Sequence, residues 1–143
     1  MTAVIVDAGA LYAQADADEP QHAAVAAVLR EEHGALVTSQ VLVAEADCLI
    51  LRRLGVDVEM RFLEDLADGT YVVDALTPPE LTVARDIVAR YRDLELGLAD
   101  ASLVVLASRW RTRRILTLDE RAFRAVTPLQ GGAFEVLPAD APR

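Results

Sequence analysis

The stretch Ala3-Val4-Ile5-Val6-Asp7 decides the fold that the sequence predicts. Four apolar residues follow one another without a break and end on a carboxylate. Such a run is typical of a strand that is buried on both faces, as in a parallel sheet covered by helices. In parallel α/β sheets, ligand sites lie just beyond the carboxyl ends of the strands. Asp7 is therefore placed where functional side chains are commonly found.

Outward from this strand, short apolar runs alternate with helical patterns along the whole chain. Further strands are expected at 36–38, 71–73, 115–118 and 134–137, the last at an edge of the sheet. Between them we expect helices over 8–13, 21–32 and 39–54, one starting near Asp57, one opened by Thr77 and Glu80, and one starting near Asp100. This alternation predicts an α/β fold, a three-layer sandwich with a parallel sheet of four or five strands flanked by helices.

Length and composition predict one domain over residues 1–143, with 138–143 as a loose tail. No apolar run approaches the roughly 20 residues that span a membrane, and no signal-peptide pattern opens the chain. Cys48 is the single cysteine and has no partner for an internal disulfide. Together these features predict a cytoplasmic protein without a membrane partner.

The charge of the chain is negative, with a formal net charge of −9. This balance argues against broad, passive binding to nucleic acid. All fourteen basic residues are arginines. Four of them gather at 109–114, where two interpretations stay open: a solvated helix end favoured by the helix dipole, or contacts with RNA phosphates or an acidic partner. These four are Arg109, Arg111, Arg113 and Arg114.

Four acids stand at unusual positions. Asp119 directly follows the strand predicted at 115–118, so it lies near Asp7 if the two strands are neighbours. Glu45 is three residues after Leu42, on what we expect to be the buried face of its helix. Asp100 shares an apolar face at the start of another helix. An ionised carboxylate on an apolar face is costly unless it is paired or binds a metal.

Each acid also has a purely structural interpretation. Asp100 could cap a helix, Glu45 could pair with a core arginine, and Asp7 and Asp119 could cap the turns that follow them. These interpretations do not explain four acids at such places in one small chain. Carboxylates that share a site cannot all stay charged cheaply, and Mg²⁺ or Mn²⁺ bound by oxygen ligands resolves that conflict. Such a cation can stabilise charge on a phosphoryl group.

Four segments, 4–11, 43–45, 96–101 and 116–123, carry a resemblance to a known family. In order and spacing the chain resembles the PIN-domain ribonucleases, especially the VapC-type toxins of bacterial toxin–antitoxin pairs. The resemblance implies a PIN-like fold and an endoribonuclease that hydrolyses RNA phosphodiester bonds with Mg²⁺ or Mn²⁺. It implies that Asp7, Glu45, Asp100 and Asp119 are the catalytic acids, with Asp7 and Asp100 as direct metal ligands.

The resemblance also implies partners: an RNA substrate such as tRNA or rRNA, a cognate antitoxin that inhibits the enzyme, and a second copy in a homodimer. The helices from Ser39 and Asp57 are apolar enough to form a groove for such a partner. One departure is Gly9, where the family often has serine or threonine, and Thr117 is a polar residue that could compensate.

Two alternatives to a nuclease remain at the level of sequence. One is a catalytically weak PIN-fold module that only binds a partner. The other is a different metal-dependent phosphoryl-transfer α/β domain, such as a receiver domain or a haloacid-dehalogenase-type phosphatase. Those families use a lysine near the phosphoryl group, and this chain has none.

Overall fold

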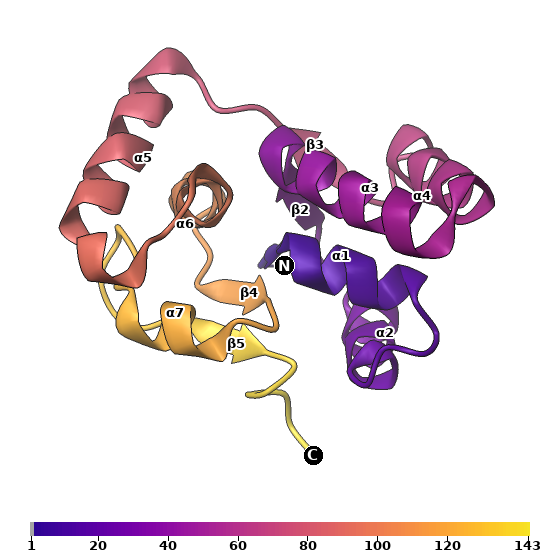
Figure 1. Ribbon diagram of the computed structural model, residues 1–143. Helices are drawn as coiled ribbons and strands as arrows, with labels where there is room; N and C mark the ends of the chain where they lie inside the picture. The colour runs from indigo at the N-terminus through magenta and orange to yellow at the C-terminus, as the bar shows by residue number, and fades with distance from the viewer. Residues whose placement is uncertain (1) are drawn as a thin grey trace.

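The central element of the structure is a five-stranded parallel sheet (Figure 1). The structure, a computed structural model, describes residues 2–143 and gives the strand order β3-β2-β1-β4-β5. All three residues of β1 have an exposed fraction of 0%, so the predicted strand is indeed buried on both faces. The strands are β1 (Val4–Val6), β2 (Leu36–Ser39), β3 (Val72–Asp74), β4 (Arg114–Leu116) and β5 (Glu135–Leu137).

Helices cover both faces of this sheet. Helices α5 and α6 lie on one side and α1 and α2 on the other (Figure 1), which confirms the predicted three-layer α/β sandwich. Helix α3 joins the two helical layers because it packs against both α1 and α6, and α4 packs on α3. The helices are α1 (Ala8–Ala15), α2 (His22–Glu31), α3 (Gln40–Leu54), α4 (Val56–Ala67), α5 (Pro78–Arg90), α6 (Leu98–Arg109) and α7 (Glu120–Ala125), with a 3₁₀ helix η1 (Arg92–Leu94). No helix in residues 2–143 is both long and apolar enough to cross a bilayer.

The register of β1 and β4 sets the position of two predicted site residues. The two strands are parallel neighbours, with Val6 opposite Leu116. The backbone N–H of Asp7 donates to the carbonyl of Leu116 at 2.9 Å, which continues the ladder by one residue. Because parallel strands end at the same edge of a sheet, Asp7 and Asp119 both follow strands at the carboxyl edge, as predicted.

Helix starts agree with the sequence in part. The helix that Thr77 and Glu80 were predicted to open is α5, and the two residues form a capping box at its start. The side chain of each accepts a hydrogen bond from the backbone N–H of the other. Helix α6 begins at Leu98 rather than near Asp100, because the extended backbone of Gly97 precedes it. Asp100 consequently lies inside the first turn of α6, where the dipole favours a negative charge. Helix α7 was not predicted from the sequence.

The segment after β5 is attached to the body of the protein at Asp140. Arg124 of α7 donates to both carboxylate oxygens of Asp140, at 2.7 and 2.8 Å. The backbone N–H of Val136 also donates to Asp140 at 2.8 Å. These contacts hold at least part of 138–143, which the composition had suggested to be a loose tail.

A salt-bridge cluster ties α6 to β3 and α5, and it predicts a pH effect on stability. Arg109 pairs with Asp74 at 2.9 Å and with Glu80, and it lowers the pKa of Glu80 to about 2. A lowered carboxyl pKa stabilises the fold above the unfolded value of about 4.3, and this contribution is lost as the pH falls toward 2. We expect Glu80→Gln to be less stable than wild type at pH 6, with the difference shrinking toward pH 2. Urea unfolding at both pH values measures this, and a difference that does not change with pH would contradict it.

Candidate active site

Asp7 is the most buried of the four acids, with 8% of its surface exposed. One carboxylate oxygen accepts the backbone N–H of Ala8 at 2.7 Å, so Asp7 does cap α1. The other accepts the hydroxyl of Thr117 at 2.6 Å. Burial raises the pKa of Asp7, the two hydrogen bonds oppose this, and the charges of Glu45 and Asp119 raise it further. Asp7 is thus held rigidly, but its charge is poorly compensated.

Thr117 connects Asp7 to Asp119. Its buried hydroxyl donates to Asp7 and accepts the backbone N–H of Asp119 at 3.1 Å. The exposed Asp119 in turn caps α7 by accepting the N–H of Ala122 at 3.1 Å. A side chain at Gly9 would meet no other group within 4 Å, so space for the hydroxyl expected there exists but is unused. Among residues 2–143, Thr117 supplies the one side-chain hydroxyl that bonds to Asp7.

Asp100 shows that the four acids share one electrostatic site. Its pKa is raised to about 6, first by burial and then by the charges of Asp7, Asp119 and Glu45. No side chain caps α6, so the capping role considered for Asp100 is absent. Three carboxylates each disfavour the ionised form of Asp100, and such an effect requires that the groups lie close to it. The structure therefore brings all four predicted residues together.

Glu45 differs from the prediction in one respect, because it is exposed rather than on the buried face of α3. The fully buried stripe of α3 is Leu42, Ala46 and Ile50, at a spacing of four. Glu45 falls beside this stripe and is exposed, yet its charge acts on both Asp7 and Asp100. It therefore avoids the desolvation cost that the sequence suggested for it.

Two buried serines position the acids, and sequence reasoning missed one of them. The hydroxyl of Ser102 donates to the carbonyl of Ala99 at 2.6 Å and lies 2.9 Å from the hydroxyl of Ser39. Ser39, where the sequence predicted the start of a helix, caps α3 by accepting the N–H of Leu42 at 3.1 Å. This chain of bonds joins the first turn of α3 to the first turn of α6, and so fixes Asp100 relative to the helix that carries Glu45. No spacing rule in the sequence singles out Ser102.

Three of the four arginines at 109–114, namely Arg109, Arg113 and Arg114, bond to parts of the protein away from the four acids. Arg114 pairs with Glu32 at 2.8 Å, and Arg113 donates to the carbonyl of Gly131 at 2.7 Å. Both lie at the amino end of β4, at the opposite edge of the sheet from Asp7. Within residues 2–143, none of the ion pairs includes any of the four acids. The charge of the acidic site is therefore left without a protein cation.

The oxygen atoms of the four acids are suitable ligands for a divalent cation, although the acids do not form a complete coordination shell. In residues 2–143 no three His, Cys, Asp or Glu side chains are arranged as a ready-made metal site. Mg²⁺ is commonly bound by only one or two carboxylates, with water and substrate phosphate as further ligands. Two carboxylates with raised pKa values, Asp7 and Asp100, fit this requirement, because a cation would relieve the repulsion between them.

The bond from Thr117 to Asp7 gives a prediction about stability. Thr117→Val keeps the shape of the side chain but leaves one carboxylate oxygen of Asp7 and the N–H of Asp119 without this partner. We expect a loss of about 1–3 kcal/mol in the free energy of unfolding, because these groups are desolvated. Thr117→Ser keeps the hydroxyl and should recover most of this loss. Urea denaturation of both variants measures it, and equal losses would show that the methyl group matters instead.

Comparison with known proteins gives the same family that the motifs indicated. The PIN domain family matches residues 4–127. The chain is 47% identical over 135 residues to Ribonuclease VapC26 of Mycobacterium tuberculosis, covering 94% of this chain and 100% of that protein.

A solved structure shares the fold at much lower identity. The crystal structure of VapC20 of Mycobacterium tuberculosis, a Sarcin-Ricin loop cleaving toxin, superposes with a TM-score of 0.73 at 17% identity. The match covers 78% of this chain and 86% of that one. The sheet, the acidic edge and these matches agree, and the chain belongs to the PIN-domain family.

Proposed function

We propose that this protein is an endoribonuclease toxin of the VapC type that hydrolyses RNA phosphodiester bonds with the help of Mg²⁺ or Mn²⁺. The observation that carries the proposal is the shared site of Asp7, Glu45, Asp100 and Asp119, in which burial and then the charges of the other three acids raise the pKa of Asp100. The identity to a protein named a ribonuclease, over nearly the whole chain, supports RNA as the substrate.

The two inner acids would hold the cation. Asp7 is fixed by its bonds to Ala8 and Thr117, and Asp100 lies in the first turn of α6, near enough for the charge of Asp7 to act on it. A divalent cation held between them would neutralise the site and stabilise negative charge on the scissile phosphate. Asp7 and Asp100 therefore act by fixing the position of that charge, and the buried partners of Asp7 keep its carboxylate from turning away.

The two outer acids are suited to orienting water. Glu45 and Asp119 are exposed at the rim, so both reach solvent next to the inner pair. One oxygen of Asp119 is engaged by the N–H of Ala122, which leaves the second oxygen free to accept from a water molecule. In hydrolysis, such carboxylates can align water for attack on phosphorus and accept its proton as the P–O bond of the leaving nucleotide breaks.

The substrate is proposed as structured cellular RNA, with tRNA and rRNA as the two candidate classes. Expression of the chain in bacterial cells, followed by mapping of new RNA 5′ ends, tests this directly. Asp100→Asn is the matched control because it removes one charge of the site and keeps the shape of the side chain. Discrete new 5′ ends that depend on Asp100 would support an endoribonuclease. Identical 5′ ends in both cultures would favour a module that only binds a partner.

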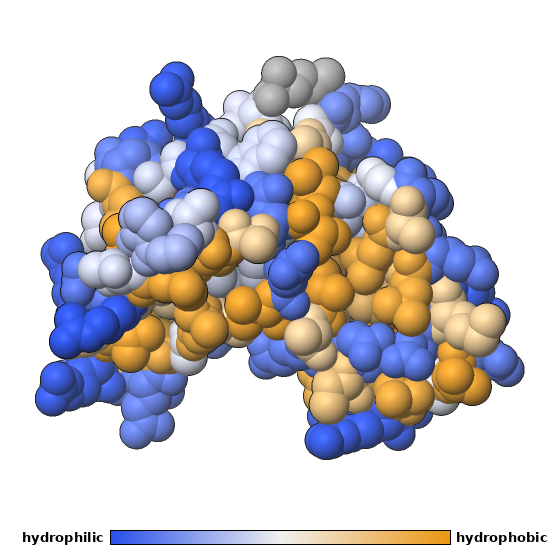
Figure 2. Space-filling model, turned by 90° about the horizontal axis from the view of Figure 1, so that it is seen from above, coloured by the Kyte–Doolittle hydropathy of each residue, from blue (hydrophilic) through white to orange (hydrophobic). Residues whose placement is uncertain are grey.

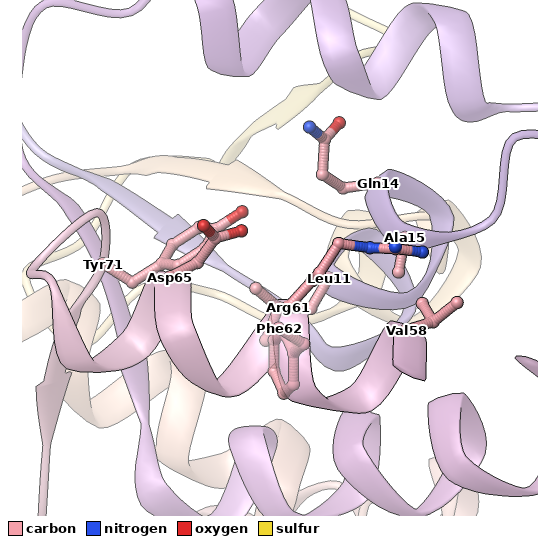
Figure 3. A pocket seen from close by; sticks show the side chains of 8 residues that line it. All are labelled: Leu11, Gln14, Ala15, Val58, Arg61, Phe62, Asp65 and Tyr71. Carbon is pink, nitrogen blue, oxygen red and sulfur yellow. The ribbon is translucent and has the colours of Figure 1, made fainter. Parts of the chain in front are cut away.

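An antitoxin is the second proposed partner, and a groove between two helices suits it. The groove has a volume of about 210 Å³ and lies between α1 and α4. Figure 3 shows Asp65 and Tyr71 at one end of it and Val58 with the Arg61 side chain at the other. Further exposed apolar residues lie on α3 and α4, namely Leu51, Val56, Met60 and Leu63.

Seen from above, the molecule has two projecting lobes separated by a hollow, with apolar side chains on both (Figure 2). Besides α3 and α4, exposed apolar residues lie on α5, at Leu81 and Val88. We propose that these surfaces serve the antitoxin and a second copy of the chain. Light scattering on the purified protein, alone and with antitoxin, measures whether it is a dimer.

The proposed inhibition gives a prediction about metal affinity. An arginine presented by the antitoxin could take the place of the cation, because its planar fork suits paired carboxylates. The free protein should then bind Mn²⁺ more tightly than the antitoxin complex does. Titration calorimetry on both forms measures this, and equal affinities would show that the antitoxin inhibits away from the acids.

A further inference from the structure

A second hollow adjoins the acidic site and shares Asp119 with it. It has a volume of about 330 Å³ and lies between the segment after α5 and the start of α7. Its lining residues are Asp93, Leu94, Glu95, Asp119, Arg121 and Ala122. Because Asp119 belongs to both, a polymer whose scissile phosphate lies at the four acids would pass directly into this hollow.

Arg121 is the distinctive residue of this hollow. Among the described residues that line it, Arg121 alone is basic. Its guanidinium is exposed and forms no ion pair within residues 2–143, although three acids line the same hollow. Arg113, Arg114 and Arg124, by contrast, are each engaged by carbonyls or carboxylates of the fold. Arg121 thus keeps all its donors for a ligand.

We propose that this hollow is a nucleotide subsite next to the point of cleavage, and that Arg121 binds the RNA phosphate beside the scissile one. The inference rests on the proposed function. In a chain with a net charge of −9 and no lysine, arginines are the side chains that stay positively charged and can neutralise RNA phosphates. The planar fork of Arg121 suits a phosphate through two parallel hydrogen bonds.

The acids of the hollow define the rest of the ligand. Asp93 and Glu95 can only accept hydrogen bonds when ionised, and they repel a second phosphate. The part of the ligand that lies against them must therefore be neutral and carry donors. A ribose hydroxyl or a base amino group meets this requirement, which limits the hollow to one nucleotide with its single phosphate.

Cleavage kinetics of Arg121→Ala on a short labelled RNA test the inference. The RNA should span a cut site mapped for the wild-type protein. We expect KM to rise about 10-fold with kcat nearly unchanged, as for loss of a charge-assisted contact made in the ground state. The slope of log(1/KM) against log salt should fall by roughly 0.7, the value for one phosphate contact on single-stranded nucleic acid. Arg121→Lys keeps the charge and should recover part of the loss.

Arg30→Ala is the matched control. Arg30 is exposed near the end of α2, two residues before Glu32, which pairs with Arg114 at the far edge of the sheet. Arg30→Ala removes one positive charge, as Arg121→Ala does, but at a place away from the proposed path of the RNA. The KM and the salt slope of Arg30→Ala should therefore equal those of the wild type.

Neutral methylphosphonates placed one at a time beside the cut complete the test. One position should raise the KM of the wild type about 10-fold and leave Arg121→Ala unaffected. The subsite is disproved if the methylphosphonates affect Arg121→Ala as strongly as the wild type at every position. It is also disproved if the KM of Arg121→Ala equals that of Arg30→Ala. If the wild type cuts no RNA at all, the proposed function fails and this inference fails with it.

Discussion

Asp100→Asn should abolish RNA cleavage and at the same time make the protein more stable at neutral pH. Loss of a metal ligand removes several kcal/mol of transition-state stabilisation, so we expect a fall in kcat/KM of roughly 1,000-fold or more. The pKa of Asp100 is raised to about 6 by burial and by the other acids, so its ionised form weakens the fold. Asparagine has the same shape and carries no charge.

The pH dependence of this stability difference follows from the raised pKa. An aspartate whose folded pKa lies above its unfolded value near 3.9 costs stability as the pH rises through the interval between them. Asp100→Asn should match the wild type near pH 4 and exceed it at pH 7.5, by on the order of 1 kcal/mol after allowance for solvent screening. Metal-free thermal melts at both pH values measure this. A variant that is less stable at pH 7.5 would show that Asp100 supports the fold.

Asp7→Asn should abolish cleavage as well, but its effect on stability is more complex. The carboxylate of Asp7 accepts the hydroxyl of Thr117, and an amide nitrogen at this position cannot. The relief of repulsion is therefore offset by a lost hydrogen bond. For this reason Asp100 is the better position at which to separate function from folding.

Addition of Mg²⁺ should stabilise the wild-type protein, and more so at pH 8 than at pH 5. A ligand that binds only the folded state at 100 times its Kd adds about 2.7 kcal/mol of stability. At pH 5 most of Asp100 is protonated, since its pKa is about 6, and protons compete with the metal. Melting curves with 10 mM Mg²⁺ and with a chelator, each at both pH values, measure the two gains. The expected gain is absent in Asp100→Asn.

The contrary outcome for the metal is equally definite. If Mg²⁺ raises the melting point of wild type and Asp100→Asn by the same amount, it binds elsewhere on this acidic surface. Ca²⁺ provides a control for general screening of charge, because it is larger and prefers more ligands. If Na⁺ at the same ionic strength raises the melting temperature by as much as Mg²⁺ does, the effect is general screening of charge and not binding at the site.

Much of the fold could be predicted because its signals are local. A short unbroken apolar run rich in β-branched residues is typical of a strand at the centre of a covered sheet, which is where β1 lies. The capping box of Thr77 and Glu80 marks the start of α5 by itself. Helix α7 is only six residues long and has little room for an apolar period, so it escaped prediction.

The positions of site residues could be predicted where the order of the strands determines them. They were harder to predict where the packing of helices and side chains determines them. Asp7 and Asp119 follow neighbouring parallel strands, and this brings them to one edge whatever the side chains do. The exposure of Glu45 depends on the rotation of α3 against α1 and α6, which a helical wheel gives only to within one side chain. Ser102 acts through a partner 63 residues away, and a single sequence carries no signal for that pairing.

Cleavage of one labelled RNA by the purified protein tests the central claim most directly. The wild type and Asp100→Asn are each incubated with it at pH 7.5, with Mg²⁺ or with excess chelator, and Arg30→Ala serves as a folded control with intact acids. Discrete fragments should appear only with Mg²⁺, and only for wild type and Arg30→Ala. Fragments of the same pattern from Asp100→Asn, or from the wild type in chelator, would contradict a metal-dependent nuclease built on these acids.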